Sequence, residues 1–229
     1  MYLLDVDNLR LKTLMESWQK AQLQPQEAFD WSRSTTRWQR DLPEYANFID
    51  QLPSLIDRKF LRGLIAKKEH SVLEKFLAVM IWGYGDLGYG PYRVNKMFGS
   101  SGVEAKIANV FELCQFGKPL EAYAFLAKNR ISQLGPAYGT KLICFFTPRE
   151  IVAPIYDSFI WKWMEKYAED TFEGRSSSSE VWNLETYSAY LNWVRMHSER
   201  FACFSDELEL VIFRDAVDQF SNSSKWAGR

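Results

Sequence analysis

The sequence predicts an all-α protein, and three observations support this. Apolar residues recur at helical spacing along much of the chain, capping residues precede several of these stretches, and turns rich in glycine and proline separate them. The chain has 229 residues, of which 47% are hydrophobic. This length can bury the core of one large domain or of two small lobes.

Residues 1–70 are expected to form helices and loops. Leu9–Lys20 carries a modest amphipathic stripe, which predicts a helix. The polar stretch Pro25–Pro43, with Trp31 and Trp38, indicates a loop containing one short helix. A further helical stripe is formed by Leu61, Leu64 and Ile65. We place a boundary after residue 70, and the sequence does not indicate what this segment does.

Residues 71–229 are expected to form the main domain. Ser71 caps the strongly apolar run Val72–Trp82. The next ten residues, Gly83–Tyr92, hold four glycines, one proline and three tyrosines, which predicts a shaped loop. Further helices are predicted over Arg93–Phe98, Ser101–Leu113, Pro119–Lys128, Thr140–Phe146, Asp157–Tyr167, Val181–Phe201 and Asp206–Phe220, with a surface loop at Arg175–Ser179.

The overall charge limits how the protein could bind nucleic acid. The net charge is −1 and the sequence pI is about 6.2, which argues against a protein that coats DNA through charge alone. Binding of phosphates through backbone amides and helix N-termini remains compatible with this balance. Aromatic residues make up 16% of the chain, and such side chains fill cores and also stack on bases.

Cysteine and histidine usage argues against two kinds of site. Cys114, Cys144 and Cys203 are far apart and form no CxxC pair, so neither a disulfide framework nor a zinc site is indicated. Only His70 and His197 could add imidazole ligands. The chain shows no secretory signal pattern and no uncharged apolar stretch of about 20 residues. We therefore expect a cytoplasmic protein without a membrane span.

The segment Leu134–Ile143 is expected to join two helices through a tight turn, giving a hairpin at about residues 131–146. Gly135, Pro136 and Gly139 shape the turn, and the second helix is expected to start at Thr140. Unpaired amides at such a helix start can bind a DNA phosphate. The alternative is an ordinary helix–helix connection. The expected phosphate contacts are the amides of Tyr138, Gly139 and Thr140, helped by Lys128, Arg130 and Arg149.

Lys141 and Asp157 are the candidate reactive pair. Lys141 is expected in the first turn of its helix, where the helix dipole disfavours a cation and so favours the neutral, nucleophilic amine. Asp157 is expected at the start of the next helix among apolar neighbours, where a carboxylate can stabilise positive charge on a sugar. The alternatives are a solvated surface lysine and a helix N-cap.

These motifs resemble a known family. Pro136–Lys141 and Ala153–Asp157 look like the P-x-x-G-T-K hairpin and the V-P-V-D segment of the 8-oxoguanine DNA glycosylases, which belong to the helix-hairpin-helix superfamily. The resemblance implies two helical lobes with the active site in the cleft between them. It also implies that Lys141 attacks the sugar, expels the base and forms a Schiff base, with Asp157 assisting. The Schiff base would permit β-elimination, which is an AP-lyase activity.

Two other segments agree with this resemblance. Phe76–Phe98 is similar to the family's segment in which a loop enters the duplex, so Tyr89 and Tyr92 are candidate wedges that fill the gap left by a flipped nucleotide. Glu209–Phe213 is similar to the helix whose phenylalanine stacks on the flipped base, a place that Phe213 takes. Phe145 is a second candidate for stacking. The alternative for all these aromatic residues is packing within the protein.

The sequence departs from the family at several positions. Ala137 replaces the central glycine of the hairpin, Phe145 stands where a cysteine lines the base pocket, and Glu209 replaces a glutamine that reads the base edge. Residues 1–70 do not resemble the family's sheet lobe. The resemblance therefore carries the chemistry better than the substrate, which could be 8-oxoguanine or a bulky hypermodified base. Glucosylated hydroxymethylcytosine, removed by compact bacterial anti-phage glycosylases, is one such base.

The resemblance also implies the partners. Carbonyls of Gln133, Gly135 and Tyr138 would hold a potassium or sodium ion, and no other cofactor is expected. The partner would be double-stranded DNA containing a modified base, bound by a monomer, in DNA repair or in anti-phage defence. Two alternatives stay open: a glycosylase in which Asp157 activates water and Lys141 is a spectator, and a non-catalytic DNA-binding module.

Overall fold

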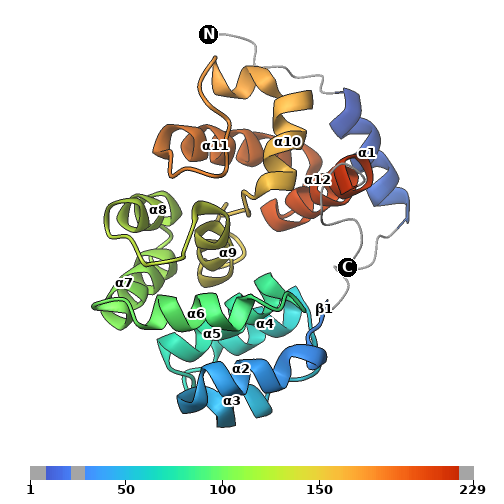
Figure 1. Cartoon of the computed structure of the whole chain (residues 1–229). Coiled ribbons are helices and arrows are strands. Elements are labelled where there is room, and N and C mark those ends of the chain that lie inside the picture. The colour runs from blue at the N-terminus through green and yellow to red at the C-terminus, as the bar shows by residue number, and fades with distance from the viewer. Residues whose placement is uncertain (1–8, 22–28, 222–229) are drawn as a thin grey trace.

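The computed structural model describes residues 9–21 and 29–221, and these residues confirm the all-α prediction (Figure 1). The only strands in these ranges are β1 (Phe29–Asp30) and β2 (Leu55–Ile56), which pair antiparallel with Phe29 opposite Ile56. The twelve α-helices are α1 (Leu9–Ala21), α2 (Thr35–Asp41), α3 (Ala46–Asp50), α4 (Arg58–Ala66), α5 (Val72–Tyr84), α6 (Gly90–Phe98), α7 (Val103–Gln115), α8 (Pro119–Lys128), α9 (Pro136–Phe146), α10 (Ser158–Tyr167), α11 (Leu184–Phe201) and α12 (Ser205–Phe220).

Helix α5 is the centre of one group of helices. It packs against α4, α6, α7 and α9, and its residues from Lys75 to Trp82 are all buried. The start of α5 is fixed by a capping box: the Ser71 hydroxyl accepts the amide of Glu74, and the Glu74 carboxylate accepts the amide of Ser71. A mainly apolar helix with a strong cap is well suited to the middle of a helical lobe.

The second group is formed by α10, α11 and α12, with α1 packed on α12 (Figure 1). Asp215 of α12 accepts the indole N–H of Trp163 at 2.7 Å and forms an ion pair with Arg10 of α1. Helices α2 to α4 instead pack within the first group. The described N-terminal residues therefore contribute to both groups. A domain boundary after residue 70 stays a prediction.

Several helix boundaries differ from the sequence-based expectations, including those of α7, which runs over Val103–Gln115 instead of Ser101–Leu113. The expected ten-residue loop shortens, because α5 continues to Tyr84 and α6 starts at Gly90. The hairpin helix starts at Pro136 instead of Thr140, and α11 starts at Leu184 instead of Val181. Pro91 and Pro136 both lie in the first turn of a helix, where a missing N–H costs nothing, so each marks a helix start and not a turn.

The stretch Pro25–Pro43 contains the one short helix that the sequence predicts. This helix is α2, preceded by the 3₁₀ turn Ser32–Ser34, and α3 follows a further 3₁₀ turn at Pro43–Tyr45. Residues 22–28, which include the start of that stretch, lie outside the described residues. Trp31 and Trp38 are buried, so this segment is part of the core.

Candidate active site

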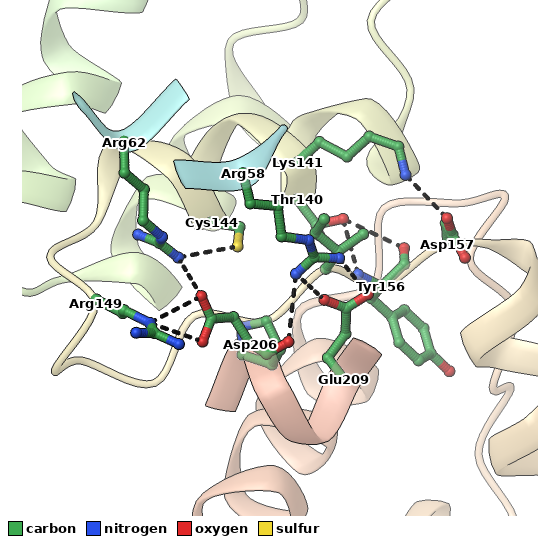
Figure 2. A network of polar contacts seen from close by, with 12 residues as sticks. Arg58, Arg62, Thr140, Lys141, Cys144, Arg149, Tyr156, Asp157, Asp206 and Glu209 are labelled. Atoms are coloured by element: carbon green, nitrogen blue, oxygen red, sulfur yellow. Dashed lines mark hydrogen bonds and ion pairs between the residues drawn. The ribbon is translucent and has the colours of Figure 1, made fainter. Parts of the chain in front are cut away.

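Lys141 and Asp157 form an ion pair at the junction of the two groups of helices. The Lys141 Nζ lies 2.9 Å from Asp157 Oδ2, and the side chains are 12% and 13% exposed (Figure 2). The amine also lies 5.9 Å from the ring centre of Trp82. A Cβ on Gly83 would come within 3.3 Å of the Lys141 chain, so the absence of a side chain there makes room for the lysine. The structure thus brings the two predicted reactive residues together.

Lys141 lies in the second turn of α9 and not in the first. Because the helix starts at Pro136, Lys141 is its sixth residue. The dipole of a helix acts mainly within its first turn. The expected destabilisation of the cation by the helix start is therefore weaker than the sequence indicated, and Trp82 and Asp157 are the groups that surround the amine.

Asp157 is both a helix cap and the partner of Lys141. It is the N-cap of α10, where its Oδ1 accepts the amides of Phe159 at 3.1 Å and Ile160 at 3.3 Å. Burial opposes the charge of this carboxylate, but Lys141 and the two amides outweigh burial and hold the pKa of Asp157 below its usual value. The N-cap interpretation of Asp157 is therefore confirmed, and its role in stabilising charge on a sugar stays a prediction.

Thr140 and Tyr156 set the distance between the reactive pair. The Thr140 hydroxyl accepts the amide of Tyr156 at 3.0 Å and also contacts the Tyr156 carbonyl at 3.3 Å (Figure 2). Thr140 and Tyr156 are the chain neighbours of Lys141 and Asp157, so these bonds hold the pair side by side. The expected role of Thr140 in binding phosphate is corrected, because its side chain is buried and its amide lies within the helix.

The hairpin amides available to a phosphate are those of the first turn of α9. The amide of Gly139 donates to the Gly135 carbonyl at 2.9 Å, so Gly139 is not a free donor as expected. The amides of Ala137 and Tyr138 lie before the first intrahelical bond. The Tyr138 ring stacks on Tyr84, with 4.2 Å between the ring centres. Ala137 stands where the family has the central glycine of the hairpin, and alanine suits this position because it lies within helix α9.

The basic residues expected beside the hairpin differ in their surroundings. Lys128 and Arg130 are exposed, and Arg130 lies 5.1 Å from the ring centre of Trp182. Arg149 is instead paired with Asp206 at 3.2 Å and Glu207 at 2.9 Å. Two carboxylates therefore already engage its guanidinium, and its contact with DNA phosphate stays a prediction.

Two of the expected base-pocket residues are closed off in this structure. Phe145 is 2% exposed and packs between Trp82 and Arg62, at 4.9 Å and 5.7 Å. Glu209 is 1% exposed and accepts two bonds from Arg58, at 2.6 Å and 3.2 Å (Figure 2). The expectation that both face the flipped base is corrected. The reason is that α4 places two arginines between α9 and α12.

Arg58 and Arg62 were not identified from the sequence. They stand four residues apart on α4 and therefore share a face. Arg62 pairs with Asp206 at 3.0 Å, which also binds Arg149. Burial opposes the charge of Arg58, but the Glu209 carboxylate raises the pKa of this guanidinium further above its usual value. The partners lie on α12, about 150 residues away in sequence, so no local pattern indicates them.

Phe213 and the two wedge candidates remain accessible. Phe213 is half-buried and lies edge-on to Phe159, with ring centres 5.7 Å apart, close to Asp157. Tyr89 is 37% exposed and Tyr92 is 59% exposed, and both lie at the start of α6. Tyr89 contacts Tyr84 edge-on at 5.8 Å. Their expected roles on DNA stay predictions.

The structure adds two observations on metals and membranes. Among residues 9–21 and 29–221, no three His, Cys, Asp or Glu side chains are grouped so that they could hold a metal ion. Gln133 has a left-handed backbone, with φ 64°, and the Gly135 carbonyl already accepts the Gly139 amide. A monovalent ion at the carbonyls of Gln133, Gly135 and Tyr138 stays a prediction. No helix in the described ranges is long and apolar enough to cross a membrane.

Comparison with known proteins also points to a DNA glycosylase. The OGG family, described as "Putative 8-oxoguanine DNA glycosylase OGG-like protein", matches residues 22–213. The chain belongs to the OGG family. No curated protein and no solved structure gives a significant match. At the level of the family, this is a DNA glycosylase that binds DNA, and the match includes Lys141, Asp157 and helices α2 to α4.

Proposed function

We propose that this OGG family member is a DNA N-glycosylase that uses Lys141 as its nucleophile and Asp157 as the assisting carboxylate. The observation that carries the proposal is the 2.9 Å pair between Lys141 and Asp157, both largely buried and held by the bonds between Thr140 and Tyr156. A buried lysine next to a carboxylate, with no helix cap or structural network depending on the lysine, is suited to reaction with a sugar.

The proposed reaction starts with a proton transfer and leads to a Schiff base between Lys141 and the sugar. The Lys141 ammonium first passes a proton, through Asp157, to the base that will leave. The free amine attacks C1′ of the sugar, a C–N bond forms, and the bond from C1′ to the base breaks with its electrons moving to the base. Asp157 stabilises the positive charge that develops on the sugar. The C1′–O4′ bond then breaks as a proton passes from the new C1′ ammonium to O4′, which gives a Schiff base. Loss of a proton from C2′ expels the 3′ phosphate and cuts the strand, and hydrolysis of the Schiff base releases the Lys141 amine.

A modified base must leave the stack before Lys141 can reach its sugar. In the proposal, Tyr89 or Tyr92 fills the gap in the duplex and Phe213 stacks on the extruded base. The amides of the first turn of α9, with Lys128 and Arg130 nearby, hold the phosphates of the same strand. Phe213 is supported in this role by its exposure and by its contact with Phe159, two residues after Asp157.

The substrate that we propose is double-stranded DNA with 8-oxoguanine or with a bulky hypermodified base such as glucosylated hydroxymethylcytosine. The first substrate would make the protein a repair enzyme and the second an anti-phage enzyme. The experiment is a base-release assay on duplexes with 8-oxoguanine or uracil and on phage DNA that carries glucosylated hydroxymethylcytosine. Release of one base above the control without enzyme supports the proposal and names the substrate.

A second candidate is a glycosylase in which Asp157 activates water. The closed ion pair favours it, since Lys141 is charge-paired in the free protein. Strand cutting after base release separates the two mechanisms, because β-elimination requires the Schiff base that Lys141 forms. Release of no base from any of these DNAs would contradict both and leave a DNA-binding module.

A further inference from the structure

Helix α2 and the 3₁₀ turn before it carry a row of exposed arginines. Arg33, Arg37 and Arg40 are four and three residues apart, which places them on one face, and all three are exposed. The segment from Ser32 to Arg40 contains no acidic residue. Among the described residues, Arg33 and Arg37 form no ion pair, while Arg40 pairs with Asp41. Asp30 lies close enough to Arg33 for their charges to interact, so Arg37 is the arginine of this row for which no carboxylate partner is seen among the described residues.

The second observation is that α2 is fixed to the start of α6. Trp38 of α2 is fully buried, and a Cβ on Gly90 would lie 3.1 Å from its ring. The side chain of Asn95 donates to the carbonyl of Asp41, at the end of α2, at 2.6 Å. Figure 1 shows α2 and α6 beside each other. The arginines are therefore held in a set position relative to the exposed tyrosines.

Arg37 and α6 together build a basic surface around these tyrosines. A Cβ on Gly88 would lie 2.6 Å from the Arg37 guanidinium, so Arg37 covers the residue next to Tyr89. Arg93 lies 4.9 Å from the Tyr89 ring centre, and Lys96 lies 5.6 Å from that of Tyr92. We call this surface the α2–α6 face, and it consists of Arg33, Arg37, Tyr89, Tyr92, Arg93 and Lys96. The acidic residues near this face in sequence are Asp30 and Asp41, on either side of the arginines, and Asp86, before Tyr89.

The α2–α6 face continues from the reactive lysine. The Lys141 chain contacts the position of Gly83, and Tyr138 of the same helix stacks on Tyr84. Tyr84 in turn contacts Tyr89 edge-on. A chain of contacts thus runs from Lys141 through Tyr138, Tyr84 and Tyr89 to the loop that Arg37 covers. If Lys141 reaches the strand with the target nucleotide while Tyr89 or Tyr92 enters the duplex, α2 at the far end of this chain is available to the other strand.

We propose that α2 binds phosphates of the DNA strand opposite the flipped nucleotide, with Arg37 as the main contact and Arg33 and Lys96 beside it. This inference rests on the proposed function, because it needs a duplex into which Tyr89 or Tyr92 is inserted. A guanidinium binds phosphate through two parallel bonds, and exposed arginine beside aromatic rings is a surface that nucleic acids fit. Residues before α5 thereby acquire a role in binding, in addition to completing the core.

The test is equilibrium binding to a labelled duplex with a central tetrahydrofuran abasic analogue, a probe that needs no knowledge of the excised base. Wild type is compared with Arg37→Gln, Arg37→Lys and the control Arg195→Gln, an exposed arginine on α11. Loss of one phosphate contact should lower the slope of log Kd against log salt by about 0.9 and weaken binding several-fold. Arg37→Lys should keep the slope, and Arg195→Gln should match wild type. Melting temperatures show that all four chains fold.

Neutral methylphosphonates identify the strand. Placed opposite the abasic analogue, they should weaken wild type and weaken Arg37→Gln no further, whereas on the other strand they should weaken both equally. An unchanged salt slope in Arg37→Gln would overturn the inference. It would also be overturned if the difference in affinity between wild type and Arg37→Gln disappeared only with methylphosphonates in the strand that carries the abasic analogue. If base release does not depend on Arg37, the proposed contact between Arg37 and DNA phosphate is overturned, and the proposed function is not. Binding that depends on Arg37, without release of any base, would overturn the proposed function alone.

Discussion

Two buried ion pairs lie close together in this protein and are built differently. Lys141 and Asp157 share one contact of 2.9 Å. Arg58 and Glu209 share two bonds, and Glu209 is only 1% exposed. When Lys141 leaves, Asp157 still accepts two backbone amides. Both side-chain hydrogen bonds seen at Glu209 among the described residues come from Arg58, so without Arg58 it would be left as a buried charge without compensation.

This difference indicates which pair can take part in a reaction. A group that reacts must change its charge and its partner during the cycle, and the Asp157 amides allow this for Lys141. Breaking a buried pair by removing one partner is strongly destabilising when nothing replaces it. We therefore interpret Lys141 and Asp157 as the reactive pair, and Arg58 and Glu209 as a structural pair that joins α4 to α12.

The largest expected effect is on catalysis, from Lys141→Gln. This change should lower base release by about 10⁴-fold or more, because the nucleophile is removed, while DNA binding stays within about twofold. The free energy of unfolding should change by only about 1 kcal/mol, since Asp157 keeps its amides. Base release and duplex binding are measured on the same preparation. An equal loss of both would make Lys141 a phosphate contact.

The next effect is on stability, from Arg58→Met. Removing one partner of a buried pair costs about 3–5 kcal/mol, so the free energy of unfolding in denaturant should fall by that amount. The double variant Arg58→Met with Glu209→Gln should recover most of the loss, because no buried charge remains. A small effect of Arg58→Met on unfolding, with a large effect on base release, would show that this pair belongs to the reactive site.

Asp157→Asn should separate the two roles of this residue. Asparagine caps helices as well as aspartate does, so α10 should be preserved and the fold should lose only the stabilisation that comes from the charge of Asp157 beside Lys141. The neutral amide cannot stabilise positive charge on the sugar or relay a proton, and the rate of base release should fall by about 10²-fold. Asp157→Ala, the comparison variant, should also lose about 1 kcal/mol of stability. Full activity of Asp157→Asn would contradict the proposed role.

The smallest effect concerns pH. Because the folded pKa of Asp157 lies below its ordinary value of 3.8, its charge stabilises the fold at pH values above about 4, and this stabilisation is lost as the pH falls further. The difference in stability between wild type and Asp157→Asn should be constant from about pH 7 to pH 5 and should shrink below about pH 4. A difference that changes between pH 7 and pH 5 would mean that burial outweighs Lys141.

Local patterns in the sequence were sufficient to single out Lys141 and Asp157, which the structure brings together, and to place most helices. Lys141 and Asp157 were identified from motifs in which the deciding residues are close in sequence, and the Ser71 cap marked the start of α5. The start of α9 was placed wrongly because proline occurs both in turns between helices and in the first turn of a helix, and Pro136 lies in the first turn. The closure of Glu209 could not be predicted, because its partner Arg58 lies 151 residues away and only the fold brings them together.

The most direct test of the central claim is borohydride trapping followed by peptide mapping. The protein is incubated with a duplex carrying an abasic site and with any DNA from which it releases a base, and borohydride reduces the Schiff base to a stable amine. We predict a covalent adduct on the peptide that contains Lys141, absent from Lys141→Gln and present in Arg58→Met wherever that variant is folded. Base release by the wild type without an adduct, or an adduct on another residue, would contradict the claim that Lys141 is the nucleophile.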